Sequence, residues 1–260
     1  MTDQQQQRSI DLSVEVPGTP EEVWETIATG PGISSWFVPH DVAEYEGGEV
    51  IMDFGTYGKE TARVVAWEPP RRVVFSSGGE HPLAYEWLVE ASAGGTCVVR
   101  LVNSGFGYGE EWDDQFAGMS EGWKLFLQNL RMHLTHFRGQ RARAVIPVGS
   151  MPGPNDAAFS ALCDALGVRP DLRPRDRFAT AGAGVPELAG TVDEIIRQPA
   201  ATAYLLLLDA PAPGTALVAA EGDGDKVTVS TYLYLYGDAA EKLEDAWTPF
   251  FAERFAALTP

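Results

Sequence analysis

Two stretches about 130 residues apart follow the same local pattern: a strand that ends in a Pro/Gly turn and is followed by the start of a helix. They are residues 10–24 (IDLSVEVPGTPEEVW) and residues 144–159 (AVIPVGSMPGPNDAAF). Farther along, residues 58–77 have a counterpart in residues 188–208, and each half closes with a helix rich in aromatic residues. Because this spacing is too long for a solenoid repeat, it predicts two tandem copies of one domain, residues 8–139 and 142–260.

Length and charge limit the classes of function. At 260 residues each half can bury a core of its own. A formal net charge of −18 disfavours nucleic acid and anionic membrane surfaces as partners. The sequence has no run of about 18 apolar residues and no apolar signal core, so we expect a cytoplasmic protein that spans no membrane. Its two cysteines, Cys97 and Cys163, fall one in each half and are expected to be buried and unpaired.

The first half predicts an antiparallel sheet followed by a long helix. Residues 8–16 alternate as a strand, and Thr19 and Pro20 suit the cap and first position of a short helix. Gly30-Pro31-Gly32 is expected to break that helix, and residues 33–37 to form a second helical turn. Five strands joined by short turns follow, at residues 49–54, 61–67, 72–77, 83–90 and 96–102. Apolar residues then recur every three or four positions over residues 111–137, which predicts one long helix.

The second half reads as a divergent copy of the first. A strand at residues 144–148 and a helix containing Phe159 and Leu162 come first. Strands are expected at residues 176–181, 188–197, 202–208, 215–220 and 226–236, before a final helix with Trp247. Each half therefore predicts an α+β helix-grip fold, in which an antiparallel sheet wraps a long C-terminal helix.

The landmarks of the first half resemble one known family. In order, they are the PGTPEEVW turn and helix start, Trp36, Gly47-Gly48, the WEPPRRVVF segment, Thr96, and Gly122-Trp123 before LFLQNL. Over residues 8–138 this order resembles the START-like (SRPBCC) superfamily, in the branch of the homologues of the heat-shock-protein-90 ATPase activator. The resemblance implies a Bet v-like helix-grip domain that can hold a ligand between sheet and helix.

Motifs of catalysis and metal binding are sparse. His133 and His136 are spaced so that both imidazoles could reach one metal ion, but no third His or Cys lies nearby in the sequence. Two strand carboxylates, Asp53 and Glu60, could point inward and act as acid or base, although most strand carboxylates are solvated. No phosphate or dinucleotide fingerprint is present. We therefore expect no metal, no cofactor and no catalytic residues.

A set of aromatic and polar residues is the best candidate site. On the strand at residues 83–90, Tyr85 and Trp87 share a face, and on the long helix Phe116, Met119 and Trp123 share another. A helix-grip fold turns these faces toward each other. We expect a cavity of roughly 300–1,000 Å³ between them. The full predicted ligand-binding set is Trp36, Phe54, Tyr85, Trp87, Asn103, Phe116, Met119 and Trp123.

Three functions fit this reading. The first is binding of a small apolar or aromatic molecule, as a carrier or sensor without catalysis. The second is a protein-interaction module like the chaperone-ATPase activators, in which case a protein partner is expected. The third is an enzyme of the cyclase or hydrolase type that the superfamily also contains. A polar acid/base pair inside the cavity would favour the enzyme, and an exposed apolar patch would favour the protein partner. The sequence leaves the ligand and the oligomeric state open.

Overall fold

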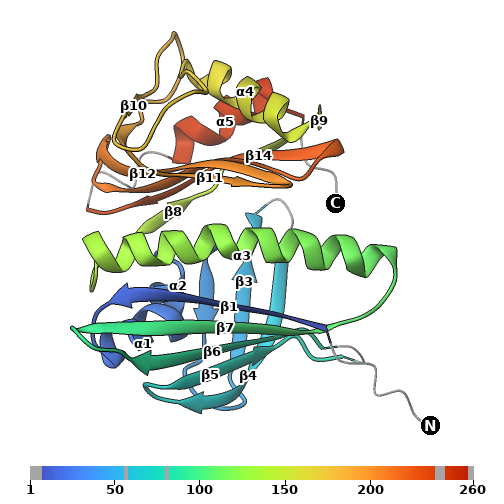
Figure 1. The fold of residues 1–260 in the computed structure, drawn as a ribbon, viewed down its shortest axis with the longest axis vertical. Helices are drawn as coiled ribbons and strands as arrows, with labels where there is room; N and C mark the ends of the chain where they lie inside the picture. The colour runs from blue at the N-terminus through green and yellow to red at the C-terminus, as the bar shows by residue number, and fades with distance from the viewer. Residues whose placement is uncertain (1–7, 56–57, 80–81, 238–243, 257–260) are drawn as a thin grey trace. The chain divides into compact units, whose positions relative to one another are not determined.

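The structure is a computed structural model that describes residues 8–55, 58–79, 82–237 and 244–256. These residues form two compact units (Figure 1). The first contains residues 8–33, 39–54 and 59–139, and the second contains residues 140–256 together with the short segment 34–38, Gly55 and Gly58. The segment 34–38 is the main departure from the predicted boundaries, because it groups with the second unit although the first encloses it in sequence.

The first unit is built on a seven-stranded antiparallel sheet in the order β1-β7-β6-β5-β4-β3-β2. Its strands are β1 (Arg8–Pro17), β2 (His40–Val42), β3 (Glu49–Asp53), β4 (Lys59–Glu68), β5 (Arg72–Ser76), β6 (Ala84–Ala91) and β7 (Thr96–Phe106). The predicted meander is confirmed, and β2 is an additional strand that the sequence analysis missed. With three residues, β2 is too short to show a period of its own.

Helix α1 (Pro20–Ala28) begins where the sequence predicts. The Thr19 hydroxyl accepts a hydrogen bond from the Glu22 N–H at 3.3 Å, and the Glu22 carboxylate accepts one from the Thr19 N–H at 2.9 Å. This capping box, with Pro20 in the first turn, satisfies N–H groups that would otherwise lack a partner.

The second helical turn lies earlier than predicted. Helix α2 spans Gly30–Ile33 and so includes the three residues 30–32 that were expected only to end the preceding helix, and Trp36 follows α2 instead of lying within it. The Thr29 hydroxyl accepts a hydrogen bond from the Gly32 N–H at 3.1 Å and so stabilises the turn. Gly32 packs closely on α1, because a Cβ placed there would lie 1.9 Å from the Glu25 carbonyl oxygen. The glycines thus allow a close helix–helix approach here.

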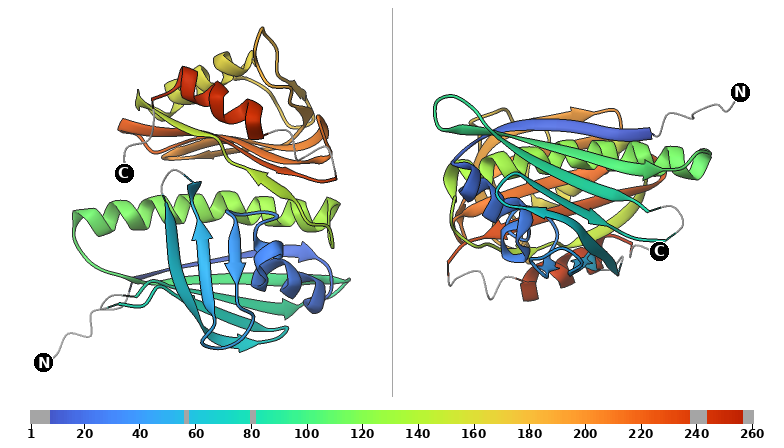
Figure 2. Two further views of the ribbon diagram at one scale, coloured as in Figure 1. Left: turned by 180° about the vertical axis from the view of Figure 1, so that it is seen from behind. Right: turned by 90° about the horizontal axis from the view of Figure 1, so that it is seen from below.

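Helix α3 (Glu110–His136) is the long helix that the periodicity predicts. Figure 1 shows it running along β1, while β3 and β4 turn steeply away from its axis. Figure 2 shows the same arrangement from behind. One face of the twisted sheet is therefore turned toward the helix, which confirms the predicted helix-grip α+β fold. Among the described residues, no helix is long and apolar enough to cross a membrane.

The second unit is also built on a seven-stranded antiparallel sheet. Its sheet follows the order β10-β11-β12-β13-β14-β8, with β9 also paired to β14. The strands are β8 (Arg143–Val145), β9 (Val148–Gly153), β10 (Arg177–Ala179), β11 (Ala189–Gln198), β12 (Ala201–Ala210), β13 (Gly214–Glu221) and β14 (Gly224–Leu235). In each unit the strands nearest the start of its sequence pair with the last strand: β1 with β7, and β8 and β9 with β14. A helix follows these first strands, and another helix follows the last strand.

The first strand of the second unit is interrupted, which the sequence analysis did not anticipate. It was predicted as one strand over residues 144–148, but β8 ends at Val145 and β9 starts at Val148. Pro147 lies in the gap, where it has no N–H to donate to the ladder, and its carbonyl oxygen accepts from the Thr231 N–H at 3.2 Å. The two short strands together flank β14 as β1 flanks β7.

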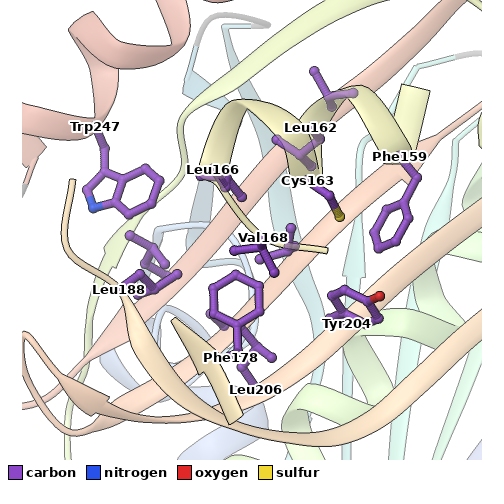
Figure 3. Close-up of a cluster of buried hydrophobic side chains, with 14 of the residues drawn as sticks. Phe159, Leu162, Cys163, Leu166, Val168, Phe178, Leu188, Tyr204, Leu206 and Trp247 are labelled. Carbon is purple, nitrogen blue, oxygen red and sulfur yellow. The ribbon is translucent and has the colours of Figure 1, made fainter. Parts of the chain in front are cut away.

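The core of the second unit lies between its sheet and two helices, α4 (Asn155–Leu166) and α5 (Glu244–Arg254). Figure 3 shows Phe159, Leu162, Cys163 and Leu166 of α4 pointing toward strand side chains that include Tyr204 and Leu206. The Tyr204 hydroxyl accepts a hydrogen bond from the Leu172 N–H at 3.1 Å, which satisfies its polar end inside this core. Trp247 of α5 is fully buried in the same cluster.

Both thiols are expected to resist modification in the folded protein. Cys97 and Cys163 are free and buried, and burial raises the pKa of both, that of Cys163 to about 12. Because the thiolate is the reactive form, a thiol-specific disulfide reagent should label neither residue at neutral pH. In denaturing guanidinium the same reagent should react with both thiols. Rapid labelling of one thiol before denaturation would show that its part of the core opens readily.

Candidate functional site

The face of the first sheet that is turned toward α3 carries one row of five buried side chains. Strand register places Ile10, Asn103, Tyr85, Phe75 and Val64 side by side across β1, β7, β6, β5 and β4. All five are buried, and Asn103 is the only one of them that carries a side-chain amide. We call this set the Asn103 row. It places a polar group in the middle of an apolar surface.

The next row on the same sheet face, closer to α1, contains two tryptophans. Register aligns Leu101, Trp87, Val73 and Trp67 across β7, β6, β5 and β4. Trp24 of α1 packs edge-on against Trp67, with ring centroids 4.9 Å apart. Helix α1 therefore covers this end of the sheet and leaves the Asn103 row to α3.

Trp123 of α3 links both rows. Its ring lies 5.9 Å from Tyr85 at an interplanar angle of 65°, and 5.5 Å from Trp87 at 81°. Both are favourable edge-to-face arrangements. The structure thus brings together three of the predicted site residues, Tyr85, Trp87 and Trp123, and the register adds Asn103 next to Tyr85.

The preceding turns of α3 are more open. Phe116 and Met119 lie on the same helix face as Trp123 and are only half-buried, whereas Trp123 is buried. Phe116 packs edge-on against Phe106 of β7 at 5.0 Å, and the Arg8 guanidinium lies 3.9 Å from the centre of its ring. Arg8 also forms an ion pair with Asp113. This face of the helix is therefore less buried at Phe116 and Met119 than at Trp123. We define the α3–sheet site as Tyr85, Trp87, Asn103, Phe116, Met119 and Trp123.

The polar groups of this site are uncharged near neutral pH. Asn103 donates a hydrogen bond from Nδ2 to the Ala84 carbonyl oxygen at 3.1 Å. Burial, and secondly the charge of Glu60, raise the pKa of Tyr85 well above its usual value. Tyr85 therefore keeps its proton near neutral pH. Glu60, an exposed residue on β4, supplies the negative charge that adds to the effect of burial on the Tyr85 hydroxyl. The site can offer hydrogen bonds from amide and phenol groups within aromatic walls.

The two remaining predicted residues are Trp36 and Phe54. Trp36 is fully buried and stacks on Phe37 at 5.8 Å, within the segment 34–38 that groups with the second unit. Phe54 follows the end of β3 and is half-buried. Their part in ligand binding stays a prediction.

The structure shows the surroundings of the two histidines and of Asp53, the side chains considered for metal binding or acid/base catalysis. His133 is buried, which lowers its pKa to about 4, whereas His136 is exposed. Asp53 forms an ion pair with Lys59 at 3.1 Å on the neighbouring strand. Among the residues that the structure describes, no group of three His, Cys, Asp or Glu side chains is placed to hold a metal ion.

Phe75 belongs to the Asn103 row but is absent from the predicted set. The sequence RVVFS of β5 shows no alternation, because Val73, Val74 and Phe75 are all buried. The sheet face on which Phe75 lies could therefore be inferred only from its pairing with Tyr85, and that pairing depends on strand register. The alternation of β6 and β7, by contrast, correctly identified the inner face.

A separate hollow of about 500 Å³ lies in the second unit, at the end of α5. Its walls come from β9, α4 and α5 and include Met151, Ala161, Ala165, Arg254 and Phe255. The Arg254 guanidinium is engaged nearby, since it lies 4.0 Å from the centre of the Phe250 ring and donates to the Phe250 carbonyl oxygen at 3.3 Å.

Comparison with known families supports the reading of the first unit. Residues 7–134, about half of the chain, match the family model described as polyketide cyclase / dehydrase and lipid transport. The first unit contains a domain of this type. The match ends close to the C-terminal end of α3, so it covers the α3–sheet site in full. A search of curated proteins gave no match.

Several solved structures are similar to the chain at low identity. Protein MLL2253 from Mesorhizobium loti is 18% identical and covers 50% of this chain and 98% of its own, with a TM-score of 0.45. The Aha1 dimer from Colwellia psychrerythraea is 19% identical, covering 51% and 99%, with a TM-score of 0.44. DynU16, encoded in the dynemicin biosynthetic locus, is 18% identical and covers 94% of this chain and 96% of its own, also with a TM-score of 0.44.

Proposed function

We propose that the first unit binds a small apolar or aromatic molecule between α3 and the sheet, at the α3–sheet site. The observation that carries the proposal is the change in burial along one face of α3. Trp123 is packed against Tyr85 and Trp87, but Met119, one turn earlier on the same helix face, is only half-buried. Aromatic walls with a few polar groups are typical of small-ligand sites. The match to a family named for polyketide cyclases and lipid transport supports the same reading.

Binding without catalysis is the version of this function that we favour. A general base that works near neutral pH needs a pKa near that pH. The pKa of Tyr85 is raised far from that range, and Asn103 does not titrate. Glu60 is a carboxylate on an exposed residue of β4. A carrier or sensor role therefore suits these groups better than a cyclase or hydrolase role.

The duplication is a second part of the proposal. Both units begin at an edge of the sheet, continue with a helical segment and a run of antiparallel strands, and end with a helix, and in both the first edge pairs with the last strand. We infer that the second unit is a divergent copy of the first, over the predicted residues 142–260. The ligand site is assigned to the first unit alone, because only that unit carries the Asn103 row and Trp123.

A ligand screen by tryptophan fluorescence and thermal unfolding tests the binding proposal. An aromatic ligand that enters beside Met119 meets the edge of Trp123, so it should quench indole fluorescence. It should also raise the melting temperature by mass action, since it binds the folded state. Met119→Trp should fill the space and abolish both effects. Val65→Trp is the matched control, because Val65 is exposed on β4 and adds the same indole away from the site.

The proposal fails on a defined result. If a broad screen of apolar and aromatic compounds leaves fluorescence and melting temperature unchanged, the α3–sheet site binds none of them. If a crystal structure also shows Met119, Phe116 and Trp123 closed onto the sheet without a void, the domain is a solid core. Equal loss of binding in Met119→Trp and Val65→Trp would instead place the ligand elsewhere.

A further inference from the structure

The Asn103 side chain has one satisfied end and one unsatisfied end. It is fully buried, and its Nδ2 donates to the Ala84 carbonyl oxygen at 3.1 Å. Its Oδ1 is buried as well and has no hydrogen-bond partner among the residues that the structure describes. Buried carbonyl oxygens are nearly always paired, because leaving one unpaired forfeits its hydration without replacement. Such an oxygen inside a candidate ligand site therefore requires an explanation.

The orientation of the amide is fixed by its neighbour. If the Asn103 amide were flipped, Oδ1 would face the Ala84 carbonyl oxygen, and two acceptors cannot share a hydrogen bond. Oδ1 must therefore point away from Ala84. The strand positions on either side of Asn103 in its row are Ile10, which has no donor, and Tyr85. The unpaired oxygen thus lies on the sheet face that is turned toward α3.

We propose that Asn103 Oδ1 selects ligands that carry a hydroxyl or N–H donor on an apolar ring system. This inference rests on the proposed function, because it assigns a ligand class to the α3–sheet site. A donor placed over the Asn103 row satisfies the buried oxygen, and the aromatic walls of Trp123, Trp87 and Tyr85 hold the ring. A ligand that presents only acceptors leaves Oδ1 unpaired, and a carboxylate, which is itself an acceptor, cannot pair with it.

Two probes of nearly equal shape test this selection. 1-Naphthol carries a hydroxyl donor, and 1-methoxynaphthalene replaces that hydrogen with a methyl group. Partition into an apolar site alone favours the methyl ether, because it is the more apolar molecule. The wild-type chain should nevertheless bind 1-naphthol about tenfold more tightly, the effect of one hydrogen bond to a buried acceptor. Both dissociation constants can be measured by titration of tryptophan fluorescence.

Variants then separate selection from structure. Asn103→Leu removes the oxygen and should bring the affinity ratio to one or below, while 1-methoxynaphthalene keeps its affinity. Ser104→Ala is the matched control on the neighbouring residue of β7, which lies on the opposite face of the strand, and it should keep the wild-type ratio. If Asn103→Leu does not fold, as judged by circular dichroism, the smaller β-branched Asn103→Val takes its place. A purely structural role for Asn103 would weaken both probes alike.

The outcomes distinguish this inference from the proposed function. If both probes bind the wild-type chain with a ratio of one or below, the site exists and donor selection is wrong. A tenfold preference that survives in the folded Asn103 variant also overturns it, because another group then accepts the donor. If neither these probes nor any other apolar compound binds, the proposed function itself fails, and the inference fails with it.

Discussion

Replacement of Trp24 by alanine is expected to lower the free energy of unfolding of the first unit by about 3–5 kcal/mol, the usual effect of truncating a buried aromatic side chain. Trp24 is 5% exposed and packs edge-on against Trp67 at 4.9 Å. The deletion removes the contact through which α1 covers one end of the sheet. Chemical denaturation followed by circular dichroism measures the loss, as a lower transition midpoint at an unchanged slope.

An exposed aromatic residue of the same unit provides the control. Tyr45 is 63% exposed, so Tyr45→Ala should change the free energy of unfolding by no more than about 0.5 kcal/mol. If Trp24→Ala and Tyr45→Ala gave the same midpoint, Trp24 would not be part of the core. The position of α1 on the sheet would then have to be revised.

Trp247→Ala should destabilise the second unit by a similar amount, about 3–5 kcal/mol. Trp247 is fully buried and packs against Phe250 and Phe251, at ring-centroid distances of 5.9 and 6.4 Å. Its indole N–H has no hydrogen-bond partner among the described residues, so the variant strands no acceptor and the loss is one of packing. Thr248→Ala, an exposed neighbour on α5, is the control and should have little effect.

Together the two tryptophan variants test the proposed division into two domains. If each unit folds as a domain of its own, Trp24→Ala lowers the midpoint temperature of one calorimetric transition, and Trp247→Ala lowers that of another. A single transition that both variants lower equally would show that the two units unfold as one, which contradicts independent domains over residues 8–139 and 142–260.

Local rules accounted for much of the fold. The Thr19 cap, the alternation of Tyr85 and Trp87 and the apolar period of α3 each depend on residues close in sequence, and the structure agrees with all three. The position of α2 was missed because two glycines usually indicate the end of a helix, whereas here they allow α2 to pack closely against α1. The short strand β2 was missed because only its partner β3 defines it.

The candidate site was less predictable, because it depends on register and on distant contacts. The inward facing of Asn103 could be read from the pattern of β7, but its single hydrogen bond to Ala84 could not. Phe75 joined the row only through its pairing with Tyr85. Trp36 was predicted to lie in the second helical turn, whereas its grouping with residues 140–256 arises from tertiary contacts that no local pattern encodes.

The interruption at Pro147 limits how far a second chain could extend the sheet at this edge. A sheet edge with an unbroken row of free N–H and C=O groups is a template onto which another chain can add a strand. In the second unit that row is divided between β8 and β9, and at Ser150 it is already occupied, since Ser150 and Ala256 exchange backbone hydrogen bonds of 2.9 and 3.1 Å. A second copy of the chain therefore finds only a few contiguous groups to pair with at this edge, too short a stretch to start a growing intermolecular sheet.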